Sequence, residues 1–313
     1  MALVRLPSEL LLHILSEVGS QFFAKDARRL TVSKRWFSFA WLVFARELRV
    51  TSQSLARFLA DEEAFRRVQP HLRSFNFFLQ AFVDDPGFDP LRLHDGTFQH
   101  CQTAWRAETD SSLTRLATAL QQCPRLESLR FAVSIHTYGL ASGTIADLIS
   151  ARHLTSLDLD LGGGPIPVVD NPGRGTHLCP RINALLPSLR RLRCRMSFMC
   201  GALLKPLETE SPLQLEEVII NLTQTKPGAV RKSMLNCRDP LASTRLSAVN
   251  AAFEDRATAL AGQLRKPRMV RVIMLKMPGR RVYAYDAVEQ RRVWLGPEAE
   301  HEWDADGEVM TED

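Results

Sequence analysis

The feature that most constrains this chain is an apolar pattern, L-x-x-L-x-L, that recurs along most of its length. The alternation of apolar and variable positions predicts a β-strand with one buried face. The copies lie at 72–77, 126–131, 154–159, 189–194, 215–220 and, more loosely, 270–275. Counted from Leu48, their central positions are 27, 54, 28, 35, 26 and 55 residues apart. These steps are close to one or two units of about 27 residues, so we expect stacked helix-and-strand units forming a parallel sheet.

The expected fold class is therefore α/β, or α+β over the whole chain. A plain α/β domain with chance leucine spacing is the alternative. Prolines and glycines predict long loops at 84–110 and 162–175. Apolar residues at steps of three and four predict a helix within 239–265. Two short apolar strands, 282–285 and 292–295, predict a terminal hairpin that caps the open edge of the sheet.

Between the inward-facing apolar positions, the intervening residues should share the other face of the sheet. The predicted members are Asn76, Phe78, Arg130, Asp158, Asp160, Arg191, Arg193, Arg195, Ile219, Asn221, Met274 and Lys276.

Charge pairing is expected for part of this face. In register, Asp158 lies beside Arg193 and Asp160 beside Arg195, and exposed cross-strand pairs contribute only about 0.2–1 kcal/mol each. Arg130 and Arg191 have no obvious partner in the pattern.

The first fifty residues are unusually apolar, with 28 apolar side chains, or 56% against 45% for the whole chain. Pro7 and Glu9 suit the first turn of a helix, which should extend to Val18. After Gly19-Ser20, Asp26 can cap a second helix through Trp36, and a third should run to Leu48. So short a segment cannot bury all of this surface internally, which predicts a helical docking module. The alternative is an ordinary helical cap on a larger core.

The runs LPSELLLHILSEV, KDARRLTVSKRW and FSFAWLVFARELRV, spanning about residues 4–50, resemble the F-box. Ala27 and the length of the 19–25 loop depart from the family pattern. The resemblance implies binding to the Skp adaptor of a cullin-type ubiquitin ligase. The adaptor-binding positions that it implies are Leu6, Pro7, Leu10, Ile14, Leu15, Val32, Arg35 and Trp36.

The repeats in turn resemble, in degenerate form, those of F-box/leucine-rich-repeat proteins. The expected organisation is an F-box at 1–50, a short leucine-rich-repeat-like solenoid with a C-terminal hairpin cap at 51–297, and an acidic disordered tail at 298–313. The tail has eight acidic side chains and no Lys or Arg; the other 40 basic and 27 acidic side chains leave +13 on the body.

No known catalytic pattern is present: the chain lacks GxxxxGK[ST], GxGxxG, GxSxG, HExxH and CxxC. We therefore expect no enzyme activity, no cofactor and no metal. The basic body lacks the dense Lys/Arg blocks and interleaved aromatic residues of nucleic-acid binders, so nucleic acid is not expected as a partner. The longest uncharged apolar run, 36–45, is too short to span a membrane, which predicts a cytoplasmic or nuclear protein with reduced thiols.

The leading functional hypothesis is a substrate receptor that holds the Skp adaptor, and through it a cullin, and binds a target protein on the repeat face. A non-catalytic scaffold whose N-terminal helices only cap the solenoid is the alternative. An acidic or phosphorylated peptide is the expected ligand, with an ordinary solvated face or a site on the long loops as alternatives. The expected substrate-binding residues are Arg130, Arg191, Arg193, Arg195, Phe78 and Lys276.

Overall fold

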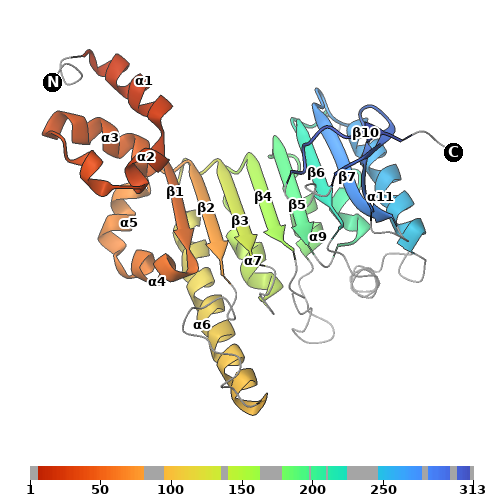
Figure 1. Cartoon of the computed structure of the whole chain (residues 1–313), viewed down its shortest axis with the longest axis horizontal. Coiled ribbons are helices and arrows are strands. Elements are labelled where there is room, and N and C mark those ends of the chain that lie inside the picture. Colours follow the sequence, from red (N-terminus) through yellow and green to blue (C-terminus); the bar gives the residue numbers. More distant parts are fainter. Residues whose placement is uncertain are drawn as a thin grey trace.

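The computed structural model describes most of the chain, and the statements below refer to that part. The described residues are 6–80, 95–134, 140–162, 178–196, 199–208, 211–223, 246–276, 281–296 and 302–310. The fold is mixed α/β, with helices at the N-terminal end and along one face of a single sheet (Figure 1).

Four short helical segments form the N-terminal end: α1 (Ser8–Val18), α2 (Ser20–Ala24), the 3-10 helix η2 (Ala27–Leu30) and α3 (Lys34–Arg46). Helix α1 ends at Gly19, whose φ of 78° suits a residue without a Cβ. Ser33 caps α3 by accepting a hydrogen bond from the backbone N–H of Trp36 at 3.1 Å. The second helix expected from the sequence is shorter than predicted, because it stops at Leu30.

The sheet has ten strands arranged in chain order. Strands β1 to β7 run parallel to one another, and the pairs β7–β8, β8–β9 and β9–β10 are antiparallel. The strands are β1 (Glu47–Thr51), β2 (Ser74–Leu79), β3 (Ser128–Val133), β4 (Ser156–Leu161), β5 (Arg191–Met196), β6 (Glu217–Asn221), β7 (Met269–Lys276), β8 (Arg281–Asp286), β9 (Arg291–Trp294) and β10 (Glu308–Val309).

The connections between the parallel strands carry the remaining helices; in Figure 1, α7 and α9 lie behind the strands, α4 and α5 lie beside β1, and α6 extends beyond the strand ends. They are α4 (Ser52–Ala60), α5 (Glu62–Val68), α6 (Asp95–Gln121), α7 (Ser142–Leu148), α9 (Leu178–Asn183), the 3-10 helix η5 (Gly201–Leu204) and α11 (Leu246–Ala261). Among the described residues, no helix is both long enough and apolar enough to cross a membrane.

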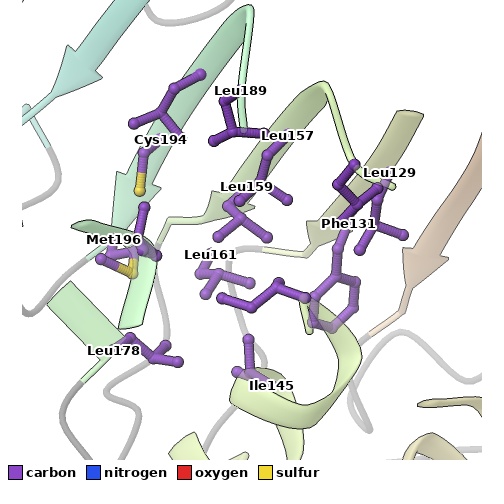
Figure 2. Packing of buried hydrophobic residues seen from close by; sticks show 14 of the residues in the cluster. Leu129, Phe131, Ile145, Leu157, Leu159, Leu161, Leu178, Leu189, Cys194 and Met196 are labelled. Carbon is purple, nitrogen blue, oxygen red and sulfur yellow. The ribbon is translucent and has the colours of Figure 1, made fainter. Parts of the chain in front are cut away.

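Alternate strand residues face these helices and form the main core. Leu157 and Leu159 of β4 are fully buried there, together with Leu129 and Phe131 of β3 (Figure 2). Burial of each such side chain contributes about 1.5–3 kcal/mol. The strands therefore expose one face to the helices and leave the other, which we call the open face, to other contacts.

A backbone hydrogen-bond pattern repeats where the strands begin. The carbonyl of the residue before a strand accepts from the two N–H groups that open the next strand. Glu127 accepts from Thr155 and Ser156 at 2.8 and 2.9 Å, and Thr155 accepts from Arg190 and Arg191 at 2.6 and 3.0 Å. The same pattern occurs at Arg73, Arg190 and Glu216. Successive units therefore have the same backbone geometry at this end of the sheet.

The structure confirms the strands predicted at each apolar repeat and the terminal hairpin, formed by β8 and β9. It also confirms a helix within 239–265, described over Leu246–Ala261. The loop predicted at 84–110 is wrong for its second part, because α6 begins at Asp95. Leu113, Leu116 and Leu120 anchor that helix in the main core. Residues 84–94, and the loop predicted at 162–175 beyond Gly162, lie outside the described residues.

Candidate functional site

The first candidate surface is the outer side of α1. Its inner side is already packed, because Leu11 and Leu15 are fully buried with Phe23 in a core internal to the N-terminal helices. Leu10 and Ile14 lie four residues apart on the outer side and are 51% and 36% exposed, and Val18 continues the row at 43%. This row has no partner within the described chain.

Exposed apolar residues are concentrated in this part of the molecule. Of the nine large apolar side chains that are exposed in the described ranges, six lie between residues 10 and 37. The three outside α1 are Phe22, Val32 and Phe37. Such concentration is typical of a surface that binds another protein. Sequence reasoning included Val32 but missed Phe22 and Phe37, because no periodicity separates their exposed faces from the buried ones.

The predicted adaptor-binding residues divide into two groups. Pro7, Leu10, Ile14, Val32 and Arg35 are exposed. The others serve the internal packing: Leu15 is fully buried, and Leu6 and Trp36 pack against the same core.

Two hydrogen bonds connect the start of α3 with earlier residues of the N-terminal helices. The indole Nε1 of Trp36 donates to the carbonyl of Arg29 at 2.7 Å, and the guanidinium of Arg35 donates to the carbonyl of Leu6 at 2.6 Å. Leu15 is fully buried and cannot contact a partner directly, and Trp36 is partly buried and held by its hydrogen bond. Both residues position the exposed row.

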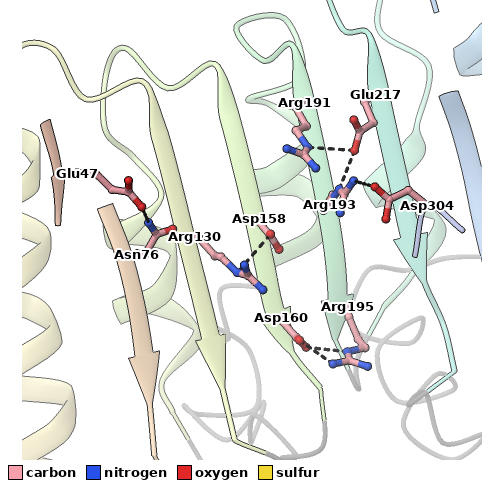
Figure 3. Close-up of polar contacts among 10 residues, drawn as sticks. All are labelled: Glu47, Asn76, Arg130, Asp158, Asp160, Arg191, Arg193, Arg195, Glu217 and Asp304. Atoms are coloured by element: carbon pink, nitrogen blue, oxygen red, sulfur yellow. Dashed lines mark hydrogen bonds and ion pairs between the residues drawn. The ribbon is translucent and has the colours of Figure 1, made fainter. Parts of the chain in front are cut away.

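The second candidate surface is the open face of the sheet, where charged residues of β3 to β6 form a network (Figure 3). The predicted register is confirmed: Asp158 is opposite Arg193, and Asp160 is opposite Arg195. Asp160 accepts two hydrogen bonds from Arg195, at 2.7 and 2.6 Å. Both side chains are largely shielded, with 20% and 11% of their surface exposed. This bidentate pair is the best-formed charge contact between strands of the face.

Three arginines have partners that the sequence pattern did not predict. Arg130 pairs with Asp158 at 3.5 Å. Arg191 and Arg193 both contact one carboxylate oxygen of Glu217, at 3.0 and 2.7 Å. Arg130 and Arg191 were expected to lack partners, so this expectation is wrong. It failed for Arg130 because Asp158, which was expected to pair with Arg193, pairs instead with Arg130 on the preceding strand. It failed for Arg191 because Glu217 begins the next strand on the same face and was left out of the predicted set.

Burial decides the electrostatics of Asp158. Loss of solvation raises the pKa of this carboxyl, and the nearby Arg130 and Arg193 guanidinium groups only partly oppose the effect. The Arg130 side chain is 59% exposed. Arg130 is therefore weakly held and available to an incoming anion.

The remaining predicted substrate residues are placed differently. Phe78 is 43% exposed, as an apolar contact for a ligand requires. Met274 does not reach the open face, because β7 alternates the other way and buries it in the main core. Lys276 pairs with Arg281 in the sheet register, and its side chain lies outside the described residues. Ile219 faces the open side but is fully buried beneath a second apolar cluster.

That cluster contains Trp303 from the predicted disordered tail. Its indole is only 5% exposed and packs with Ile219, Ile273 and Val293. Trp303, Asp304 and Ala305 lie against the open face, and Glu308–Val309 form β10 at the edge of the sheet, so the expectation of disorder is wrong for residues 302–310. The physical reason is that Trp303, a large apolar side chain within the acidic run, packs into an apolar cluster on the sheet.

A groove of about 410 Å³ lies between α4, α5 and the end of α6. Phe58 and Phe65 line its apolar side, and Arg66 and Arg115 its polar side. No sequence pattern indicates this groove, because its residues belong to three separate helices.

The buried cysteines are poor nucleophiles. Burial raises the pKa of the Cys123 thiol to about 12 and that of Cys179 well above its ordinary value, so neither forms a thiolate readily. In the ranges that the structure describes, no three His, Cys, Asp or Glu side chains are placed to hold a metal ion.

Comparison with known proteins yields no relative: no protein-family model, curated protein or solved structure matches the chain. What the chain does must therefore be inferred from its own residues and their arrangement.

Proposed function

We propose that this chain is the substrate-recognition subunit of a Skp/cullin/F-box ubiquitin ligase. The N-terminal helices act as the F-box and bind the Skp adaptor, which links the chain to a cullin in the cytoplasm or nucleus. The observation that carries the proposal is the exposed row of Leu10, Ile14 and Val18 on a helix whose opposite side is already packed. Such a row needs an external apolar partner.

The link between the helices and the sheet supports a receptor. Helix α3 ends at Arg46 and β1 begins at Glu47, with no intervening loop. Glu47 accepts hydrogen bonds from Ser20 of α2 at 2.7 Å and from Asn76 of β2 at 3.1 Å. A receptor must hold its target at a fixed distance from the ligase, and a stiff connection keeps that geometry.

The remainder of the chain acts as a short, degenerate leucine-rich-repeat-like solenoid capped by the β8–β9 hairpin. Parallel strands in chain order, helices on one face and the repeated backbone hydrogen bonds all favour this architecture. Its open face binds the target, and the chain contributes binding rather than catalysis.

The proposal is tested by purifying the full chain with the Skp adaptor and cullin. The Leu10→Asp/Ile14→Asp variant should lose both partners, because the change places two charges in an apolar interface. Both side chains are exposed in the chain alone, so the variant should fold. Ser16→Asp is the matched control, since Ser16 is an exposed residue of α1 outside the row. Equal recovery of the adaptor with the unmodified chain and both variants, each folded, would exclude the F-box assignment.

A receptor is separated from a scaffold by the fate of the bound protein. Proximity labelling of the whole chain and of the Leu10→Asp/Ile14→Asp variant would identify shared neighbours. A receptor predicts that a protein labelled by both accumulates in cells that carry only the variant. Unchanged abundance of every shared neighbour would favour a non-catalytic scaffold.

A further inference from the structure

Three arginines from the open face converge on one short piece of the C-terminal segment, defined here as residues 302–310. Arg193 donates to the carboxylate of Asp304 at 2.7 Å (Figure 3). Arg195 lies over the indole ring of Trp303, 5.2 Å from its centroid. Arg271 donates to the backbone carbonyls of Trp303 and Ala305, at 3.3 and 2.9 Å.

Each arginine recognises a different part of the segment. A carboxylate, an aromatic ring and two backbone carbonyls are each contacted by a cation. The side chains of Arg193 and Arg271 are well shielded, with 16% and 6% of their surface exposed. Arg271 also forms an ion pair with Asp286 at 3.8 Å. Arg193 and Arg195 also pair with Glu217 and Asp160 of the sheet, at 2.7 and 2.6 Å, so each of the three arginines has a partner in the sheet besides the segment.

An apolar seat completes the contact. Trp303 packs on Ile219 of β6, Ile273 of β7 and Val293 of β9, all nearly or fully buried. Asp304, the next residue, keeps 54% of its side-chain surface exposed. The binding determinants are thus an aromatic residue seated in an apolar site and an acid directly after it.

The hold on the segment is modest beyond this point. Strand β10 pairs with β9 over two residues only, and Glu308 and Val309 are exposed. Gly307 runs so close to β9 that an added Cβ would lie 2.3 Å from the backbone carbonyl oxygen of Trp294. A methyl group at residue 307 would therefore force this part of the segment to shift relative to β9.

We propose that the open face of β5 to β7 is a recognition site for an extended acidic peptide with an aromatic residue directly before an aspartate, and that residues 302–306 occupy it within the same chain. The site rests on the proposed function in one respect: in a receptor, this peptide belongs to the target. Because the bound segment is covalently attached, a target must displace it, which lowers the apparent affinity in proportion to the fraction of open sites.

The test uses the full chain and a fluorescent peptide with the sequence of residues 298–313. Gly307→Ala should bind the peptide at least about tenfold more tightly than the unmodified chain, because its own segment competes less well. Gly296→Ala is the matched control, since its added Cβ has no atom within 4 Å, and it should bind like the unmodified chain. Adding Arg193→Ala to Gly307→Ala should abolish the gain.

A second chain variant and an altered peptide test the site even if Gly307→Ala releases the segment only in part. The chain variant Trp303→Ala/Asp304→Asn removes both determinants from the internal competitor, and it too should bind the peptide more tightly. A peptide that carries the same two changes should bind none of the proteins. If neither released chain binds the peptide while circular dichroism shows it folded, or if the altered peptide binds as well as the original, the recognition site is refuted.

The adaptor takes no part in this titration, so the two proposals fail separately. Peptide binding without adaptor binding would leave the site and remove the ligase assignment. Adaptor binding without peptide binding would do the opposite.

Discussion

Two aspartates on one strand, Asp158 and Asp160, show how the surroundings of a residue decide its contribution to stability. They share the open face and are two residues apart. Asp160 accepts two short hydrogen bonds from a shielded arginine, whereas Asp158 makes a 3.5 Å contact with an arginine that is 59% exposed. The same chemical group thus serves as a fixed contact in one place and a weak one in the other.

This difference predicts unequal costs for the same substitution. Asp160→Asn should lower the free energy of unfolding by about 1–3 kcal/mol, because it leaves the shielded Arg195 without its charge partner. Asp158→Asn should change it by less than about 1 kcal/mol, since the carboxyl is already poorly stabilised in its charged form. Urea unfolding of the two variants measures both values. A larger loss for Asp158→Asn would contradict the assignment.

The contact between Asp304 and Arg193 predicts a pH dependence. The hydrogen bond from Arg193 is the main cause of a pKa for Asp304 below its ordinary value of 3.8. A lowered pKa in the folded state means that the contact stabilises the docked segment fully above that ordinary value, and that this stabilisation is lost as the pH falls through the lowered pKa.

The fluorescence of Trp303, taken as the difference between the unmodified chain and Trp303→Phe, should therefore be constant near neutral pH and change only in acid. Asp304→Asn should abolish the acid-dependent part. A transition between pH 5 and 8 that persists in Asp304→Asn would assign the change to another group.

At the scale of elements, the strands were predictable because their alternation reflects a buried and an open face. Helix α6 was not, since Pro86, Gly87 and Pro90 indicated a loop and its early residues have no apolar periodicity. Its fully buried side chains are Leu113, Leu116 and Leu120 in its later part, and Trp105 packs against the core while partly buried. A helix that extends past its packing surface shows no amphipathic pattern there, so composition alone cannot reveal it.

The packing of α6 predicts where the helix is sensitive. Leu116→Ala should cost about 2–5 kcal/mol of stability, because a fully buried side chain is removed and leaves a cavity. Glu108→Ala, at an exposed position of the same helix, should change stability by about 0.5 kcal/mol or less. Thermal unfolding of the two variants compares them directly. Equal effects would mean that the later half of α6 is not anchored as described.

At the scale of the whole molecule, the sequence predicted the order of strands and the row of charges but not the partners across the open face. Local pattern places Arg193 and Arg195 on that face. It cannot bring Asp304, 111 residues away in sequence from Arg193, onto the same surface. The N-terminal row was predictable in part, because the resemblance to the F-box implied Leu10 and Ile14 but did not separate them from the buried Leu15. Sequence pattern thus finds faces, and long-range packing decides which residues on them are free.

We propose that the chain uses two separate surfaces, the N-terminal helices for the Skp adaptor and the open face for a target. Hydrogen–deuterium exchange of the full chain, with and without purified adaptor, tests this most directly. We expect slower exchange of the helices at residues 8–37 when the adaptor is present, and unchanged exchange in β4 to β7. No protection at residues 8–37, or protection centred on the open face, would contradict it.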